Sequence, residues 1–166
     1  MPRNLDLPAL LEELGPRFAA TAAAHDADDS FVAENYAALR EAKVFSAQIP
    51  PELGGGGATH GEMCAFLRGL AGSCPATALC LSRHQHLVAA AVANDRAAVP
   101  GRKLLEKVAA GEIVLVSTGA NDWLESNGSV ERVEGGFRVS AVKPFASGSP
   151  SGNVLITSAA YDDPEE

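Results

Sequence analysis

Apolar residues recur with helical spacing along the first two thirds of the chain and alternate as in β-strands after that. Up to about residue 112, alanine and leucine dominate, and apolar positions three to four residues apart predict helices at roughly 7–24, 32–42, 59–71, 75–94 and 102–110. Valine, isoleucine, serine and threonine dominate afterwards, and the alternation predicts strands at 113–117, 130–133, 137–141 and 154–158. This switch predicts an α+β fold with an all-α helical domain at 1–112 and a β domain at 113–166.

Residues at the ends of these segments support the same boundaries. Asp6 has the position of an N-cap before the first helix. Thr59 and Glu62 have the spacing of a capping box before the third helix, and Gly111 is expected to end the fifth as its C′ residue. Two glycines at 135–136 stand between alternating runs, which predicts a β-hairpin.

The fourth predicted helix has an unusual distribution of polar residues. Its flanks, "ATALCL" and "LVAAAVA", are apolar nearly all round, which predicts a helix buried on most sides. Its centre, residues 82–86 (SRHQH), is polar at every position. Such a belt faces a cavity or a polar partner, or else Arg83 and the histidines reach the surface. His84 and His86 are therefore the first candidates for site chemistry.

Four consecutive glycines at 54–57 raise the question of a phosphate-binding loop. Gly56 and Gly61 have the separation of the P-loop glycines, but Glu62 and Met63 follow where that motif needs lysine and a hydroxyl residue. A carboxylate at that place repels phosphate, and the pattern GxGxxG is absent as well. The run is expected to form a positive-φ turn between two helices.

Composition and charge exclude several classes of function. The net charge is −8 and the pI about 5.0, so no basic patch drives nucleic-acid binding. The longest apolar stretch, Leu87–Ala93, is too short to span a bilayer, and the first residues lack the apolar core of a signal peptide. Three cysteines without a CxxC motif are typical of reduced thiols, so a cytoplasmic location is expected.

Two further clusters have a functional and a simpler interpretation. Cys80 and His84 share a helix face as a thiol–imidazole pair does, but a buried, inert thiol is the favoured interpretation. The polar residues at 25–29 (HDADD) include metal-binding types, yet their spacing favours a solvated acidic turn. No metal is therefore expected.

Three motifs, in order, resemble the N-terminal half of the acyl-CoA dehydrogenase superfamily. They are residues 51–57 (PELGGGG), 105–112 (LEKVAAGE) and 135–149 (GGFRVSAVKPFASGS). The resemblance implies a helical domain followed by an incomplete, antiparallel β-barrel-like middle domain, with the family's C-terminal helical bundle absent. The 166 residues would form less than half of a usual member.

The resemblance also implies a flavin site. FAD is the implied cofactor, with FMN as the alternative, and members usually form homo-oligomers. Two strips would contact the flavin: the end of the first strand (Val116, Ser117, Thr118) and an aromatic–hydrophobic–hydroxyl triplet (Phe145, Ala146, Ser147). Hydroxyl and amide groups suit this position because they can satisfy the polar edge of a flavin ring in an apolar pocket.

The expected activity is oxidation of a CH–CH group of an acyl thioester, and two alternatives remain open. The segment 118–123 (TGANDW) departs from the dehydrogenases' Thr-Glu-Pro…Gly-Ser-Asp stretch. The segment 143–159 (KPFASGSPSGNVLITSA) is closer to the flavin-dependent monooxygenases of the same fold, which implies a catalytic role for His86 beside Ser147. A truncated, non-catalytic chain that binds a partner is the third possibility.

The remaining site residues follow from the same resemblance. His84 and Trp123 are expected to contact a small-molecule substrate, an acyl-CoA in the first interpretation. The family's catalytic base is a glutamate normally supplied by the C-terminal bundle. Glu112 and Glu125 are expected to be solvated, so neither replaces it.

Overall fold

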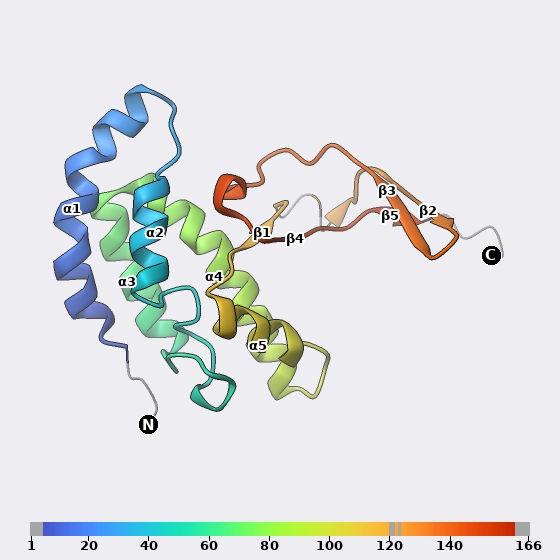
Figure 1. The fold of residues 1–166 in the computed structure, drawn as a ribbon, viewed down its shortest axis with the longest axis horizontal. Coiled ribbons are helices and arrows are strands. Elements are labelled where there is room, and N and C mark those ends of the chain that lie inside the picture. Colours follow the sequence, from blue (N-terminus) through green and yellow to red (C-terminus); the bar gives the residue numbers. More distant parts are fainter. Residues whose placement is uncertain (1–4, 120–121, 123, 162–166) are drawn as a thin grey trace.

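The computed structural model describes residues 5–119, 122 and 124–161, and shows a helical body from which a β-arm extends (Figure 1). The described helices are α1 (Leu7–Ala27), α2 (Ala33–Glu41), α3 (His60–Ser73), α4 (Pro75–Arg96) and α5 (Arg102–Gly111), with short 3₁₀ turns η1 (Pro51–Leu53) and η2 (Ser149–Ser151). The described strands are β1 (Leu115–Ser117), β2 (Ser129–Val133), β3 (Gly136–Ser140), β4 (Val154–Ile156) and β5 (Ala160–Tyr161). The α+β class is confirmed.

Local capping accounts for most helix boundaries. The Asp6 carboxylate accepts the backbone N–H of Ala9 at 3.0 Å, and Thr59 and Glu62 form the capping box that the sequence predicts. The expected stop at Gly111 is off by one residue. Gly111 is the last helical residue, and Glu112 takes the left-handed conformation with φ of 47°. Contacts of its buried carboxylate, described below, hold Glu112 in this conformation.

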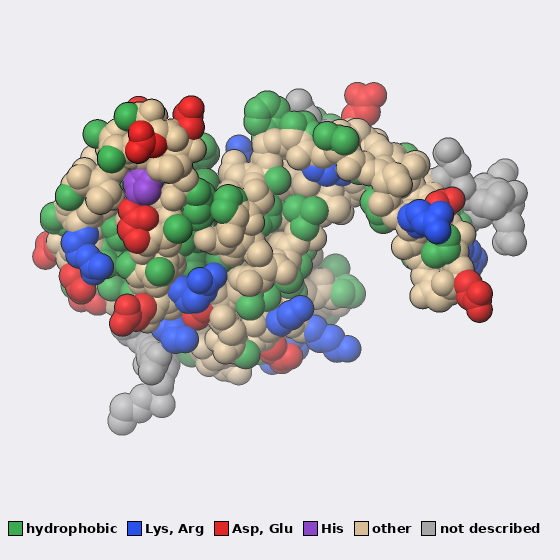
Figure 2. Space-filling view, turned by 45° about the horizontal axis from the view of Figure 1, so that its top comes forward, with side chains coloured by type: hydrophobic (Ala, Val, Ile, Leu, Met, Phe, Trp, Pro, Cys, Tyr) green, Lys and Arg blue, Asp and Glu red, His purple; other side chains and the backbone are tan. Residues whose placement is uncertain are grey.

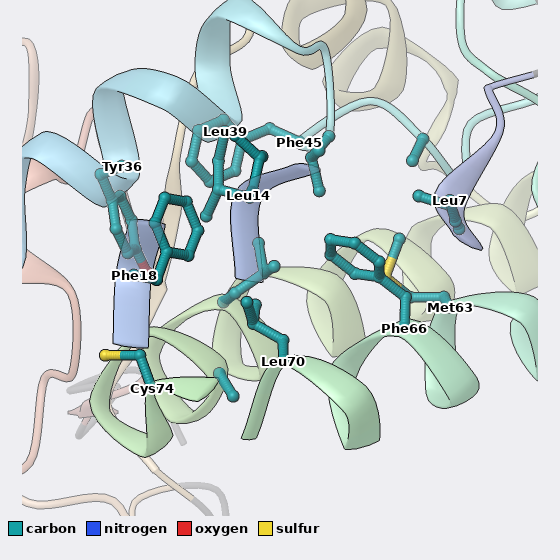
Figure 3. Packing of buried hydrophobic residues seen from close by; sticks show 14 of the residues in the cluster. Leu7, Leu14, Phe18, Tyr36, Leu39, Phe45, Met63, Phe66, Leu70 and Cys74 are labelled. Atoms are coloured by element: carbon teal, nitrogen blue, oxygen red, sulfur yellow. The ribbon is translucent and has the colours of Figure 1, made fainter. Parts of the chain in front are cut away.

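One apolar cluster holds the first four helices together. Phe18 of α1, Tyr36 of α2 and Leu70 of α3 are at most 2% exposed, and they belong to one cluster with Phe45 from the loop after α2 (Figure 3). The ring of Tyr36 lies 5.4 Å from that of Phe45, centroid to centroid. Burial of this many large apolar side chains is the main stabilising contribution in such a body.

Helix α4 runs through the middle of the body and also contributes to a second apolar cluster. Val88 of α4 packs with Leu105 of α5, Leu115 of β1 and Ile49, all fully buried or nearly so. Helix α4 is buried where it contacts α3, α5 and β1, but Leu79 is 54% exposed, so the prediction of burial on most sides holds for only part of the helix. Because β1 lies in this cluster, the first strand is held by the helical body. The domain boundary after residue 112 stays a proposal.

The strands form two small sheets of mixed direction. β1 pairs with β4 in parallel, in the register Leu115↔Val154. β2 and β3 form the antiparallel hairpin predicted from the glycines at 135–136, and β5 adds to β2 in parallel. The predicted antiparallel pattern therefore holds for the hairpin alone among the described pairs, and the described strands do not close a barrel.

The four glycines form a tight turn whose backbone is already bonded. The N–H groups of Gly55, Gly56 and Gly57 donate to carbonyls of Pro50, Ser46 and Ile49. Gly54 and Gly57 have φ of 90° and 73°, as the sequence predicts. These N–H groups are not open to a phosphate. Along the described chain, no helix combines the length and apolar character needed to cross a membrane.

Candidate functional site

A hollow of about 660 Å³ lies between α3 and α4 and reaches the end of β1. Its walls combine apolar side chains with the polar belt of α4. They are formed by Gln48, His60, Met63, Cys64 and Leu67, by Ser82, Arg83, Gln85, His86, Leu87 and Ala90, and by Ser117, Gly119 and Leu124. We call this space the α3/α4 hollow.

A second hollow of about 550 Å³ adjoins it at the base of the arm, and we call it the arm hollow. Arg83, Gly119 and Leu124 line both spaces, and Thr118, Asp122 and Phe145 are among the further residues of the second. In the space-filling view, hydrophobic side chains gather on the arm close to the helical body (Figure 2). The large hydrophobic side chains that are exposed after β1 include Leu124, Val142, Phe145 and Leu155.

The polar belt of α4 divides between the hollow and the interior. His86 is exposed on the α3/α4 hollow together with Ser82 and Arg83, as the cavity interpretation expects. Partial burial lowers the pKa of the His86 imidazole, and the charge of nearby Arg83 acts in the same direction. A largely neutral imidazole at this place can accept or donate a proton near neutral pH.

His84 has a different environment from the one predicted. Its side chain is fully buried, Nε2 donates to the carbonyl of Phe45 at 2.8 Å, and Nδ1 accepts the N–H of Leu115 at 2.9 Å. Desolvation lowers its pKa to about 4. Neither nitrogen is available to a substrate or to Cys80, so the expected substrate contact and the thiol–imidazole pair are not found here. This histidine joins α4 to β1.

The two predicted flavin strips come partly together. Thr118 and Phe145 line the arm hollow, and Ser117 lines the adjoining α3/α4 hollow. Val116 is buried in β1, whereas Ala146 and Ser147 are half-buried and line neither hollow, so Ser147 does not share a space with His86. Trp123 lies outside the described residues.

The hydroxyl groups at the end of β1 are engaged in local bonds. The Ser117 hydroxyl accepts the N–H of Gly119 at 3.3 Å, and the Thr118 hydroxyl donates to the Asp122 carboxylate at 2.5 Å. Phe145 has φ of 61° and a side chain that is 87% exposed. An exposed ring in a strained conformation beside a hollow is suited to covering a ligand or another part of the protein.

An ion pair that the sequence did not reveal fixes the base of the arm. Lys143 contacts Asp122 and donates to the carbonyls of Asn127 and Ser158 at 2.7 and 2.6 Å. Hydrogen bonds from Lys143 and then Thr118 hold the pKa of Asp122 well below its usual range. The lysine is visible in the "KPFAS" segment, but nothing in the sequence pairs it with a residue 21 positions away.

The prediction that Glu112 is solvated is wrong. Glu112 is 1% exposed, and its carboxylate accepts hydrogen bonds from the backbone N–H and the hydroxyl of Ser46. Desolvation raises its pKa, partly offset by these hydrogen bonds. Glu125 is exposed, as expected. Among the described residues no group of three or more histidine, cysteine or acidic side chains is arranged to hold a metal ion.

Comparison with known proteins gives a family and a fold. Residues 12–112 match the family described as the acyl-CoA dehydrogenase N-terminal domain. No curated protein matches the chain significantly. Several solved structures share the fold over nearly the whole chain.

The methanesulfinate monooxygenase MsuC from Pseudomonas fluorescens is 23% identical over 96% of this chain, with a TM-score of 0.80. KijD3, solved with dTDP, is 27% identical over 95% of this chain, with a TM-score of 0.79, and another structure of KijD3 contains FMN and a dTDP-linked amino sugar. TdsC from Paenibacillus sp. A11-2, solved with FMN and indole, is 19% identical over 98% of this chain, with a TM-score of 0.80. The chain spans about 40% of the length of each of these proteins.

Proposed function

The chain belongs to the acyl-CoA dehydrogenase family, and from this premise we propose that it forms one wall of the flavin and substrate site of a flavin-dependent oxidoreductase. The observation that supports the proposal most is the pair of adjoining hollows at the end of β1. Residues that the resemblance assigns to the flavin, Ser117, Thr118 and Phe145, line these hollows, and His86 lies on the same side of α4.

The residues present suit a flavin. The arm hollow combines an exposed aromatic ring with the backbone of residues 118–119, a combination that can pack against a flat ring and bond its polar edge. Arg83 lies where both hollows meet and can pair with an anionic group of the cofactor or substrate. FMN occurs in the structures of KijD3 and TdsC, which supports FMN alongside FAD as the candidate.

The position of His86 on the α3/α4 hollow supports oxygen insertion as the first candidate chemistry. Acyl-CoA dehydrogenation needs a base for the α-proton, which the C-terminal bundle normally supplies in this family, so the lining of the hollow by itself does not argue against it. His86 has a lowered pKa and can act as a proton acceptor or donor beside a bound substrate. A reduced flavin would supply the electrons that activate molecular oxygen. Acyl-CoA oxidation remains the second candidate, because the family match supports it.

A flavin titration of the purified chain tests flavin binding, which both candidate functions require. Quenching of FMN or FAD fluorescence is expected, and Ser117→Phe should weaken it by about tenfold because the new ring fills the end of the hollow. Ser140→Phe, on exposed strand β3, is the matched control and should leave binding unchanged. A chain that binds neither flavin would contradict the proposal.

Turnover then separates the two chemistries. A monooxygenase consumes oxygen when reduced flavin and an oxidisable small molecule are supplied, and His86→Gln should lower that rate by about 100-fold or more if it transfers a proton. A dehydrogenase instead reduces an artificial electron acceptor when given an acyl-CoA. Size-exclusion chromatography with light scattering tests the homo-oligomer that the family resemblance implies.

A further inference from the structure

A thiol, an imidazole and a buried amide form a chain of contacts on the α3/α4 hollow. The Sγ atom of Cys64 lies 3.6 Å from Nε2 of His60, one turn earlier on α3. Nδ1 of the same ring lies 3.3 Å from the side-chain nitrogen of Gln48, a residue that is 7% exposed. All three residues line the hollow, and Cys64 is exposed.

This arrangement directs a proton toward the sulfur. The Gln48 amide donates to Nδ1, so a neutral His60 ring carries its own proton on Nε2, the atom that faces Cys64. An N–H at this position stabilises a thiolate, which is the nucleophilic form of cysteine. Because Gln48 is almost completely buried, it holds the ring in this orientation.

The other two cysteines lack these conditions. Cys74 is 1% exposed and accepts hydrogen bonds from Asn35 and Thr77. Cys80 is half-buried, and burial raises the pKa of its thiol. Cys64 is therefore the cysteine with both access to a ligand and a polar partner for a thiolate.

We propose that Cys64 is a covalent modification site for apolar electrophiles that carry an electron-poor carbon–carbon double bond, with His60 and Gln48 as positioning residues. The apolar side chains of the hollow, Met63, Leu67 and Leu87 among them, bind the body of such a molecule beside the sulfur. The sulfur forms a bond to the β-carbon, the π electron pair of the double bond moves to the α-carbon, and that carbon takes up the proton given up by the thiol. The step needs neither a flavin nor oxygen, so it does not depend on the function proposed above.

Site-resolved alkylation of the purified chain tests this. N-ethylmaleimide and N-phenylmaleimide are the small and the bulky apolar probe, glutathione is the reference thiol, and mass spectrometry reports the rate at each cysteine. At pH 7, Cys64 should react at least about tenfold faster than Cys80. Its preference for the phenyl reagent over the ethyl reagent should exceed that of glutathione, because the hollow binds the ring.

Substitutions distinguish the contribution of the His60 imidazole to the reaction of Cys64 from the contribution of the hollow. His60→Gln should slow alkylation of Cys64 about tenfold at pH 7, while leaving its preference for the phenyl reagent over the ethyl reagent unchanged. A merely structural role of His60 would alter the hollow and change that preference as well. Gln48→Leu should give a smaller loss of the same form. His25→Gln, a histidine that pairs with Glu34 outside the hollow, should change nothing.

Ala90→Gln tests the hollow itself. The longer polar side chain from α4 should abolish the preference for the phenyl reagent while leaving the rate with the ethyl reagent intact. The proposal is overturned if Cys64 reacts no faster than glutathione, or if His60→Gln has no effect at pH 7. An unchanged reagent preference in Ala90→Gln would overturn the part played by the hollow.

Discussion

Nδ1 of His84 accepts the backbone N–H of Leu115 at 2.9 Å, which fixes the centre of α4 to the first strand. The opposite nitrogen donates to Phe45, so a single side chain joins α4, the loop after α2 and β1. Val116 and Ser117 follow directly in that strand. The position of the candidate flavin wall relative to His86 on α4 therefore depends on a neutral His84.

The stability of the protein should fall as the pH decreases from about 6.5 toward 4. Burial holds the pKa of His84 at about 4, below its ordinary value of 6.5, so the unfolded chain binds a proton in this range before the folded chain does. The stabilisation present above pH 6.5 is lost progressively as the pH falls. The whole difference between the unfolded and folded pKa of His84 corresponds to on the order of 3 kcal/mol. Urea unfolding monitored by circular dichroism across this range measures it.

Substitution isolates the contribution of His84. In His84→Gln the difference in unfolding free energy from the wild type should shrink as the pH falls, because the variant lacks the titrating ring. His86→Gln is the matched control on the same helix and should retain most of the wild-type pH dependence. An equal slope for the wild type and His84→Gln would contradict the assignment.

Glu112 should produce a pH dependence of the opposite sign. Its pKa is raised in the folded state, so the folded chain holds a proton that the unfolded chain releases once the pH exceeds 4.5. Glu112 therefore lowers the free energy of unfolding by an increasing amount as the pH rises from 4.5 through the pKa of its carboxyl group in the folded protein.

Glu112→Gln should remove this cost, because an uncharged amide oxygen can still accept a hydrogen bond from Ser46. The melting temperature of the variant, relative to the wild type, should be higher at pH 8 than at pH 4.5. Glu41→Gln, at an exposed position at the end of α2, serves as the control. A constant difference at both pH values would rule out the raised pKa.

Gly55 should not tolerate a side chain, although it lies in a run of glycines. A Cβ atom there would stand 2.2 Å from the carbonyl oxygen of Ile49, a backbone atom that cannot move aside. Gly55→Ala is expected to cost about 1–3 kcal/mol or more. Gly61→Ala, where a Cβ meets nothing within 4 Å at the start of α3, should be neutral or stabilising by up to about 1 kcal/mol. Comparable effects in chemical denaturation would contradict this distinction.

The helical half could be predicted because its signals are local. Asp6, Thr59 and Glu62 act within one turn of where they stand, and the apolar period of each helix reports its buried face directly. The polar belt of α4 likewise predicted either a cavity or polar partner, or a surface position for its histidines. It could not distinguish His86, on the hollow, from His84, in the interior, because residues two apart on a helix face different directions.

Long-range partners account for what the sequence did not show. Glu112 and Ser46 are 66 positions apart in the sequence, and no local sequence pattern predicts that a carboxylate following a glycine is buried. Where β1 and β4 begin to pair, the N–H groups of Asn153 and Val154 both donate to the carbonyl of Val114, a residue far away in the sequence. Alternation within a strand predicts its faces but does not identify its neighbour.

Lys143 should control the order of the arm independently of the helical body. Its ammonium contacts Asp122 and two backbone carbonyls, and both charged side chains are at most 9% exposed. Lys143→Met would leave the Asp122 carboxylate without its partner in a shielded position, a costly change. Amide hydrogen exchange in residues 129–161 should therefore become faster, while exchange in α1–α4 stays unchanged. Arg138→Met removes the exposed ion pair with Glu131 on the same arm and should have little effect. Equal acceleration in the two variants would show that Lys143 contributes no more than a surface charge.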